Sequence, residues 1–184
     1  MRTLTTLTVL VPTLVLAGCS GDVATSPRSQ TLVTAPRATD ASRALASRSI
    51  SGQCRLTALA TDPYPAPPVF RQVAVGACEL SHLGRVTVQF TQVVNFAART
   101  QQSLELTYTA PNGDVLRAAS AGTSAPTATG VTYSATLTFL GGTGRFANAS
   151  GQAHADGTAD LVAGTSQYTL DGWITYDAAD RNAR

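Results

Sequence analysis

The sequence predicts an all-β domain of about eight antiparallel strands between residues 51 and 178. Short runs rich in Val, Thr, Phe and Tyr are separated by Gly, Pro and Asn, and several of these runs alternate apolar with polar residues. No stretch of the domain has the periodicity of an amphipathic helix of three turns. This number of strands in a domain of this length fits either a closed barrel or a sandwich of two sheets.

The eight expected strands lie near residues 53–60, 69–77, 85–96, 104–108, 115–120, 131–139, 149–161 and 166–176. The clearest is 85–96, where Val86, Val88 and Phe90 begin an apolar series with a period of two, so that one face should be buried. Leu104, Leu106 and Tyr108 repeat that pattern. The turn after them is Pro-Asn-Gly-Asp, and its Gly113 can adopt a positive φ.

A glycine-rich segment favours the barrel. Residues 139–151 read Phe-Leu-Gly-Gly-Thr-Gly-Arg-Phe-Ala-Asn-Ala-Ser-Gly. Gly141, Gly142 and Gly144 allow a tight turn, after which Phe146 can plug the end of a barrel. The segment resembles the G-G-T-G-x-F-x-x-A-x-G stretch of allene oxide cyclase and dirigent-like barrels, and of small exported bacterial proteins that share this architecture. The resemblance implies an eight-stranded barrel.

Residues 78–85, Cys-Glu-Leu-Ser-His-Leu-Gly-Arg, are similar to a His-Leu-Gly-Arg segment in uncharacterised bacterial members of that group. The plant members either cyclise an unsaturated fatty-acid epoxide or direct the coupling of phenoxy radicals. Their catalytic groups project from other strands into the barrel, whereas the matching glycine-rich segment is mainly a structural turn in the family. The resemblance therefore implies a fold, and no catalytic residue is carried over.

The same glycines also fit the G-x-G-x-x-A pattern of a dinucleotide-binding turn, at residues 142–147. That motif works only where it opens a helix whose N-terminus holds the pyrophosphate. Asn148, Ser150 and Gly151 argue against such a helix. The chain also has no G-x-S-x-G elbow, H-E-x-x-H, P-loop or complete EF-hand loop, so we expect neither a cofactor nor a metal.

The N-terminus predicts an exported, lipid-anchored protein. Arg2 precedes an apolar segment at residues 4–16, which ends in Leu-Ala-Gly-Cys and resembles the lipobox of bacterial lipoproteins. The segment is shorter than the roughly 20 apolar residues that span a bilayer. We expect a signal peptide at 1–18, a lipidated Cys19 followed by a flexible linker to residue 50, a barrel at 51–178 and a tail at 179–184.

This organisation places the protein in the bacterial cell envelope, facing the periplasm or the outer surface, with membrane lipid as a partner through acylated Cys19. The alternative is an ordinary secretory signal, which would leave Cys19 as an odd thiol. Lipidation of Cys19 leaves Cys54 and Cys78, which predict one disulfide that closes a loop of about 25 residues and stabilises the fold by roughly 3 kcal/mol. A redox or metal pair is the alternative for these two cysteines.

The charges exclude a nucleic-acid partner. All 13 basic residues are arginine, and residues 51–178 contain six arginines against eight acidic residues, a net charge of −2. No basic patch of the size that binds nucleic acid is left in the domain.

Several side chains are candidates for binding. His82, beside Gly84 and Arg85, should lie in a loop that enters the strand at 85–96, where it either binds a ligand or holds the turn. For Arg85, the alternative to ligand binding is an exposed interaction with a side chain on a neighbouring strand. His154 and Asp156 share one face of a strand with Asp160, either as a cation or acid–base cluster or as a solvated outer face.

Aromatic residues supply the remaining candidates. Trp173 shares parity with the polar residues of its strand, so it either covers the outside of the barrel or lines the interior with Tyr108 and Tyr133. An interior lined by the three would suit a flat apolar ligand, and a solidly packed core is the alternative.

The function expected is a non-catalytic envelope barrel that binds a small apolar molecule or a partner. The alternatives are a cyclase or isomerase with groups inside the barrel, and a structural interaction module.

Overall fold

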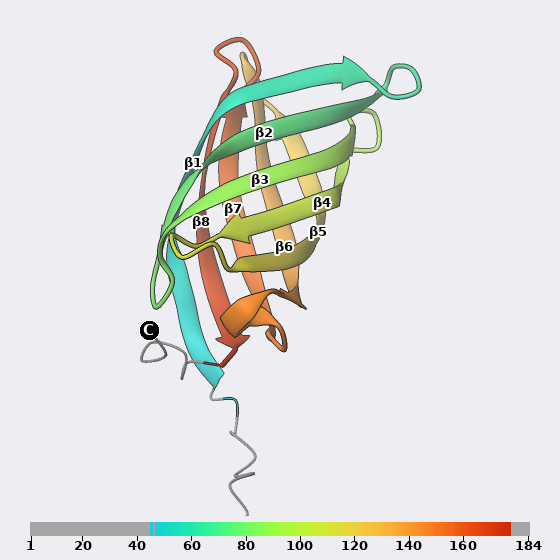
Figure 1. Cartoon of the computed structure of the whole chain (residues 1–184). Coiled ribbons are helices and arrows are strands. Elements are labelled where there is room, and N and C mark those ends of the chain that lie inside the picture. Colours follow the sequence, from blue (N-terminus) through green and yellow to red (C-terminus); the bar gives the residue numbers. More distant parts are fainter. Residues whose placement is uncertain (1–44, 46, 178–184) are drawn as a thin grey trace, which may run out of the picture. The chain divides into compact units, whose positions relative to one another are not determined.

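The computed structural model describes Leu45 and residues 47–177, apart from the side chain of Ala58. Eight antiparallel strands form a closed barrel in which each strand pairs with its neighbours in sequence and the first pairs with the last (Figure 1). The strands are β1 (Ser47–Pro63), β2 (Val69–Leu80), β3 (Gly84–Asn95), β4 (Thr100–Thr109), β5 (Val115–Pro126), β6 (Gly130–Gly142), β7 (Ser150–Asp160) and β8 (Thr165–Thr175). The predicted barrel is confirmed. The expected signal peptide, Cys19, most of the expected linker and the expected tail at 179–184 lie outside the described residues.

The first strand begins earlier than the expected domain boundary at residue 51. β1 starts at Ser47, and Ile50 is fully buried opposite Gly172 of β8. Residues 47–50 are therefore part of the barrel and not of the linker. The strand expected at 115–120 is also longer, because β5 continues to Pro126 along β6.

A bulge in β4 changes which residues face the core. Thr91 of β3 pairs with Glu105 and Gln92 pairs with Ser103, so Leu104 is the extra residue between them. An extra residue reverses the alternation of the strand beyond it. Leu104 is consequently 58% exposed, although its spacing to Leu106 predicted a shared buried face.

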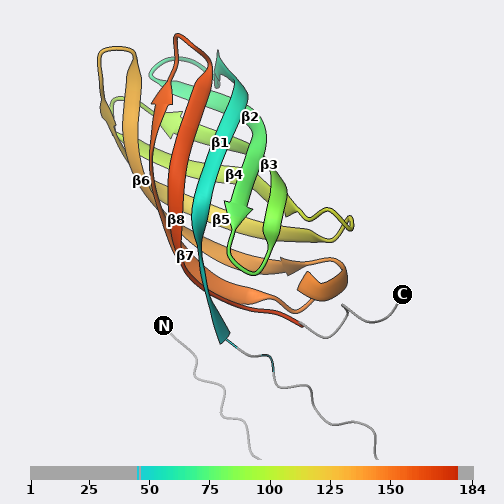
Figure 2. The same ribbon diagram turned by 90° about the vertical axis from the view of Figure 1, so that its left-hand side faces the viewer.

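One end of the barrel, which we call the plugged end, contains Ser47, Thr175 and the β6–β7 connection (Figure 2). Gly141, near the end of β6, and Gly144, in the connection, both adopt positive φ, and the connection includes a short 3-10 helix (Gly144–Phe146). The helix places Phe146 in the barrel with no exposed surface, its ring centroid 5.5 Å from that of Tyr176. Phe146 therefore plugs this end, as the glycine-rich segment predicted.

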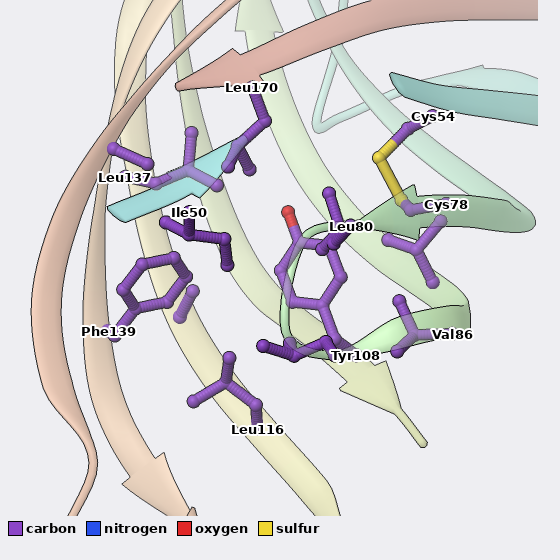
Figure 3. Packing of buried hydrophobic residues seen from close by; sticks show 14 of the residues in the cluster. Ile50, Cys54, Cys78, Leu80, Val86, Tyr108, Leu116, Leu137, Phe139 and Leu170 are labelled. Carbon is purple, nitrogen blue, oxygen red and sulfur yellow. A yellow bond between two sulfur atoms is a disulfide. The ribbon is translucent and has the colours of Figure 1, made fainter. Parts of the chain in front are cut away.

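Large apolar side chains fill the barrel behind this plug. Ile50, Leu116 and Phe139 point inward from three strands and are buried in one cluster (Figure 3). The cluster also contains the predicted disulfide, because Cys54 of β1 lies directly opposite Cys78 of β2 and the two sulfur atoms are bonded. Within the described residues, no helix is long and apolar enough to cross a membrane.

Candidate functional site

The barrel interior contains a cavity with a volume of about 50 Å³. Most of its lining lies toward the end opposite the plug, which we call the pocket end and which comprises the connections at residues 64–68, 96–99, 127–129 and 161–164. The lining residues are Leu59, Phe90, Gln92, Gln101, Leu106, Tyr108, Ser120, Tyr133, Ala135, Leu137, Ala155, Ala159, Ser166 and Tyr168.

Small residues at inward positions make room for this cavity. Ala135 of β6 and Ala155 and Ala159 of β7 are buried and line it, whereas the next inward residues of β6 toward the plug are Leu137 and Phe139. Gly157 lies between the two β7 alanines, and a Cβ at that position would collide with the ring of Tyr133. The alternation of Ala and Gly along β7 therefore lets an aromatic ring lie close to the strand and leaves the space beside it unfilled.

Three tyrosines provide the aromatic part of the lining. The hydroxyl of Tyr108 lies 3.2 Å from that of Tyr168. Tyr133 donates to Ser166 Oγ at 3.0 Å, because Ser166 donates its own proton to the carbonyl oxygen of Thr158 at 2.9 Å. Burial raises the pKa of Tyr108 and Tyr168 far above the ordinary value, and that of Tyr133 to about 12. All three hydroxyls are therefore neutral near pH 7.

Glutamines provide the amide groups. Gln92 Nε2 donates to Gln72 Oε1 at 2.8 Å across the β2–β3 pair, and Gln72 Nε2 lies 3.4 Å from Thr61 Oγ1. Gln101 of β4 is 8% exposed, lines the cavity, and makes no side-chain hydrogen bond within the described part of the chain. The interior thus carries two amides with hydrogen-bonding capacity that is not used, one end of Gln92 and the whole of Gln101.

The described lining contains no Asp, Glu, His, Lys or Arg. Its titratable groups are the three tyrosines, and each is held in its protonated form by burial. Near neutral pH these side chains can donate and accept hydrogen bonds, but none of them exchanges a proton readily. In the described residues, no cluster of three or more His, Cys, Asp and Glu side chains is placed to hold a metal ion.

Two of the predicted binding residues, Tyr108 and Tyr133, come together in this cavity. Trp173 does not join them: it is 45% exposed on the outer face of β8, while Tyr168 and Leu170 of that strand point inward. Trp173 therefore covers the outside of the barrel, the first of its two expected positions.

The two histidines and their neighbours also lie away from the cavity. On the outer face of β7, His154 Nε2 lies 3.3 Å from Asp156 Oδ2 and 3.0 Å from Ser134 Oγ. This is the solvated outer face that was one of the two expectations for the pair.

The third acidic residue of that strand, Asp160, holds the β7–β8 turn. Hydrogen bonds from the backbone N–H of Ala163, from the Thr129 hydroxyl and from the N–H of Val162 lower its pKa. This carboxylate therefore stabilises a connection at the pocket end and does not face the cavity.

At the opposite end, His82 is exposed in the β2–β3 turn with φ 64°, and its carbonyl oxygen accepts a 3.5 Å hydrogen bond from the Tyr176 hydroxyl. Arg85 lies across from Glu79 with Nε 3.8 Å from Oε1, an exposed pair between strands. Such a pair is worth at most about 1 kcal/mol.

Sequence reasoning did not select Gln72, Gln92, Gln101, Ser166 or Tyr168. One signal was available for Gln92, which shares parity with Phe90 and Val94 and so had to point inward. A polar residue inside an apolar series of one face marks either a bulge or a buried hydrogen-bonding group. β3 has the second.

No protein-family model, curated protein or solved structure matches this chain. A function for the protein must therefore be inferred from its fold and its cavity.

Proposed function

We propose that this protein is a lipid-anchored barrel of the bacterial cell envelope that binds a small apolar molecule, without catalysis, in the cavity near its pocket end. The observation that carries the proposal is the lining: aromatic and aliphatic side chains around a cavity with a few amide and hydroxyl groups. Small-molecule sites combine an apolar surface with a few polar groups in this way.

The size of the cavity limits the ligand. The 50 Å³ is the volume that the centre of a water-sized sphere can occupy, and one water molecule requires about 10–15 Å³ of it. The cavity therefore has room for roughly three to five waters. At about 30 Å³ for each water, the volume is on the order of 100–150 Å³, which is near that of a cavity that holds benzene. Drug-sized sites are larger, at about 300–1,000 Å³. The cavity thus suits a single ring or a short chain, either as a whole molecule or as the buried part of a larger one.

The anchor rests on the lipobox resemblance at Cys19 and on the disulfide. A disulfide is typical of exported proteins, and Cys54 and Cys78 form one here. The eight-stranded topology is also the one that the resemblance to the bacterial barrels of the allene oxide cyclase and dirigent-like group implies. These observations favour a protein that acts on molecules that reach the envelope.

Ligand-observed fluorine NMR with fluorobenzene tests the proposal. The full-length protein is held in lipid nanodiscs, and empty nanodiscs correct for probe that dissolves in lipid. A ligand of this size that fits an apolar cavity should bind with a Kd on the order of 0.1–1 mM. Ala155→Leu places a larger side chain in the cavity and should weaken binding at least tenfold. Ala119→Leu, on the exposed face of β5, is the matched control and should leave binding unchanged.

Thermal unfolding separates loss of the site from loss of the fold. Should Ala155→Leu unfold, Ala159→Leu fills the cavity from a position nearer the pocket end. The proposal is overturned if fluorobenzene gives no signal above the empty nanodiscs, or if either filled variant folds and binds it as the parent does.

A further inference from the structure

We propose that the cavity prefers a neutral ligand group that both donates and accepts hydrogen bonds, such as a carboxamide, over a carboxylate of the same size. This inference rests on the proposed function, because it describes the polar part of the ligand that the same cavity would hold. Gln101 is the observation that carries it, since its side chain is 8% exposed, lines the cavity and makes no hydrogen bond to another described residue.

Among the described residues, the fully buried polar side-chain atoms without a hydrogen-bond partner are Arg48 Nε and Arg145 Nε, so water in the cavity still reaches the amide of Gln101. A ligand that displaces this water must replace the hydrogen bonds that the amide makes to it. β4 places this side chain inward between Val94 of β3 and Gly122 of β5, and neither neighbour offers a polar side-chain atom. A hydrophobic residue would fill the position with less cost to stability. The amide is therefore better explained by recognition than by packing.

Gln92 supplies a second amide on the neighbouring strand. One end of it is held by Gln72, which in turn lies against Thr61, so that this amide is fixed in position by the β1–β2–β3 sheet. Its other end has no partner among the described residues. A ligand amide placed between Gln92 and Gln101 could donate to one and accept from the other, because each glutamine carries both functions.

The charge of the lining sets the preference against an anion. No described lining residue is a cation, and the two described arginines near the pocket end point elsewhere. Arg71 pairs with Asp62 at 2.9 Å on the outside, and Arg99 is exposed in the β3–β4 turn. Tyr133 donates to Ser166, and one of the two protons of the Tyr108–Tyr168 pair is used between their hydroxyls, so the tyrosines leave a single neutral O–H donor and no positive charge. A carboxylate buried here would lose its hydration without gaining a counter-ion, which is strongly unfavourable.

Two probes of matched shape, 4-fluorobenzamide and the 4-fluorobenzoate anion, test the preference by the same fluorine NMR measurement at pH 7. Fluorobenzene is the smaller third probe, which has no polar group. We expect 4-fluorobenzamide to bind at least tenfold more tightly than 4-fluorobenzoate. Gln101→Leu should weaken 4-fluorobenzamide three- to tenfold while fluorobenzene keeps its affinity or gains some. Gln102→Leu, on the adjacent outward position of β4, is the matched control and should change none of the three.

The outcomes separate this inference from the proposed function. If fluorobenzene binds but 4-fluorobenzoate binds as well as 4-fluorobenzamide, the preference for a neutral group is refuted and the apolar site stands. If Gln101→Leu changes the affinity of all three probes equally, Gln101 is structural and the inference fails. Absence of binding by every probe overturns the proposed function, and this inference with it.

Discussion

Reduction of the Cys54–Cys78 disulfide should lower the free energy of unfolding by about 3.5 kcal/mol. The two cysteines are 24 positions apart, so the bridge closes a loop of about 25 residues. A loop of that length restricts the unfolded chain by about 11.7 cal/mol/K on the chain-entropy model, which is about 3.5 kcal/mol at 25 °C. β1 and β2 are paired on both sides of the bridge in the folded barrel. Reduction therefore acts mainly by releasing the unfolded chain.

Urea unfolding of the purified protein, followed by circular dichroism with and without dithiothreitol, measures this difference. With a slope of about 1.5 kcal/mol/M for a domain of this size, the midpoint should fall by about 2 M. The double variant Cys54→Ser and Cys78→Ser is the control, because its midpoint should not respond to the reductant. A fall of less than about 0.5 M in the parent, or an equal response in the double variant, would refute the entropic account of this bridge.

Two further perturbations test the interior and the anchor. Burial raises the pKa of the three cavity tyrosines, so these hydroxyls lose their protons at lower pH in the unfolded chain than in the barrel. Their contribution to the free energy of unfolding is therefore complete below pH 10. It is lost as pH rises above 10, by up to about 1.4 kcal/mol per pH unit for each group. Absorbance at 295 nm should therefore show them ionising together with unfolding, and reversible ionisation near pH 10 in an intact barrel would contradict their burial. Cys19→Ala should abolish labelling by radioactive palmitate and release the protein from membranes, so continued attachment of that variant would rule out the lipid anchor.

The alternation of apolar and polar residues was sufficient to predict the barrel, because one buried face imposes a period of two on every strand. The start of β1 was not predictable by this route. Ile50 is the single large apolar residue between Ser47 and Gly52, so this part of the strand reads like the Ser- and Arg-rich linker before it. Its place in the barrel depends on pairing with β8, more than a hundred residues later in the chain. Local pattern does not contain that information.

The bulge at Leu104 has the same cause, since it is defined by the register between β3 and β4 and not by either strand alone. The cavity was predictable only in part. The inward direction of Tyr108 and Tyr133 followed from parity, but the space beside them depends on alanines that look ordinary in the sequence. The inward direction of Gln101 was even less predictable, because the bulge lies between Gln101 and the regular alternation of Leu106 and Tyr108. Its inward direction required the structure.

The two ends of the barrel differ in the side chains that they bury. The plugged end contains Phe146 and Tyr176, whereas the glutamines Gln92 and Gln101 point inward near the pocket end, where they line the cavity. The chain also enters the barrel at the plugged end, because Ser47 pairs with Thr175, the last residue of β8 (Figure 2). A tether from a lipidated Cys19 would therefore be attached at the end opposite the cavity. Since the connections of the pocket end bear no covalent link to that tether, a ligand could reach the cavity without displacing the anchor.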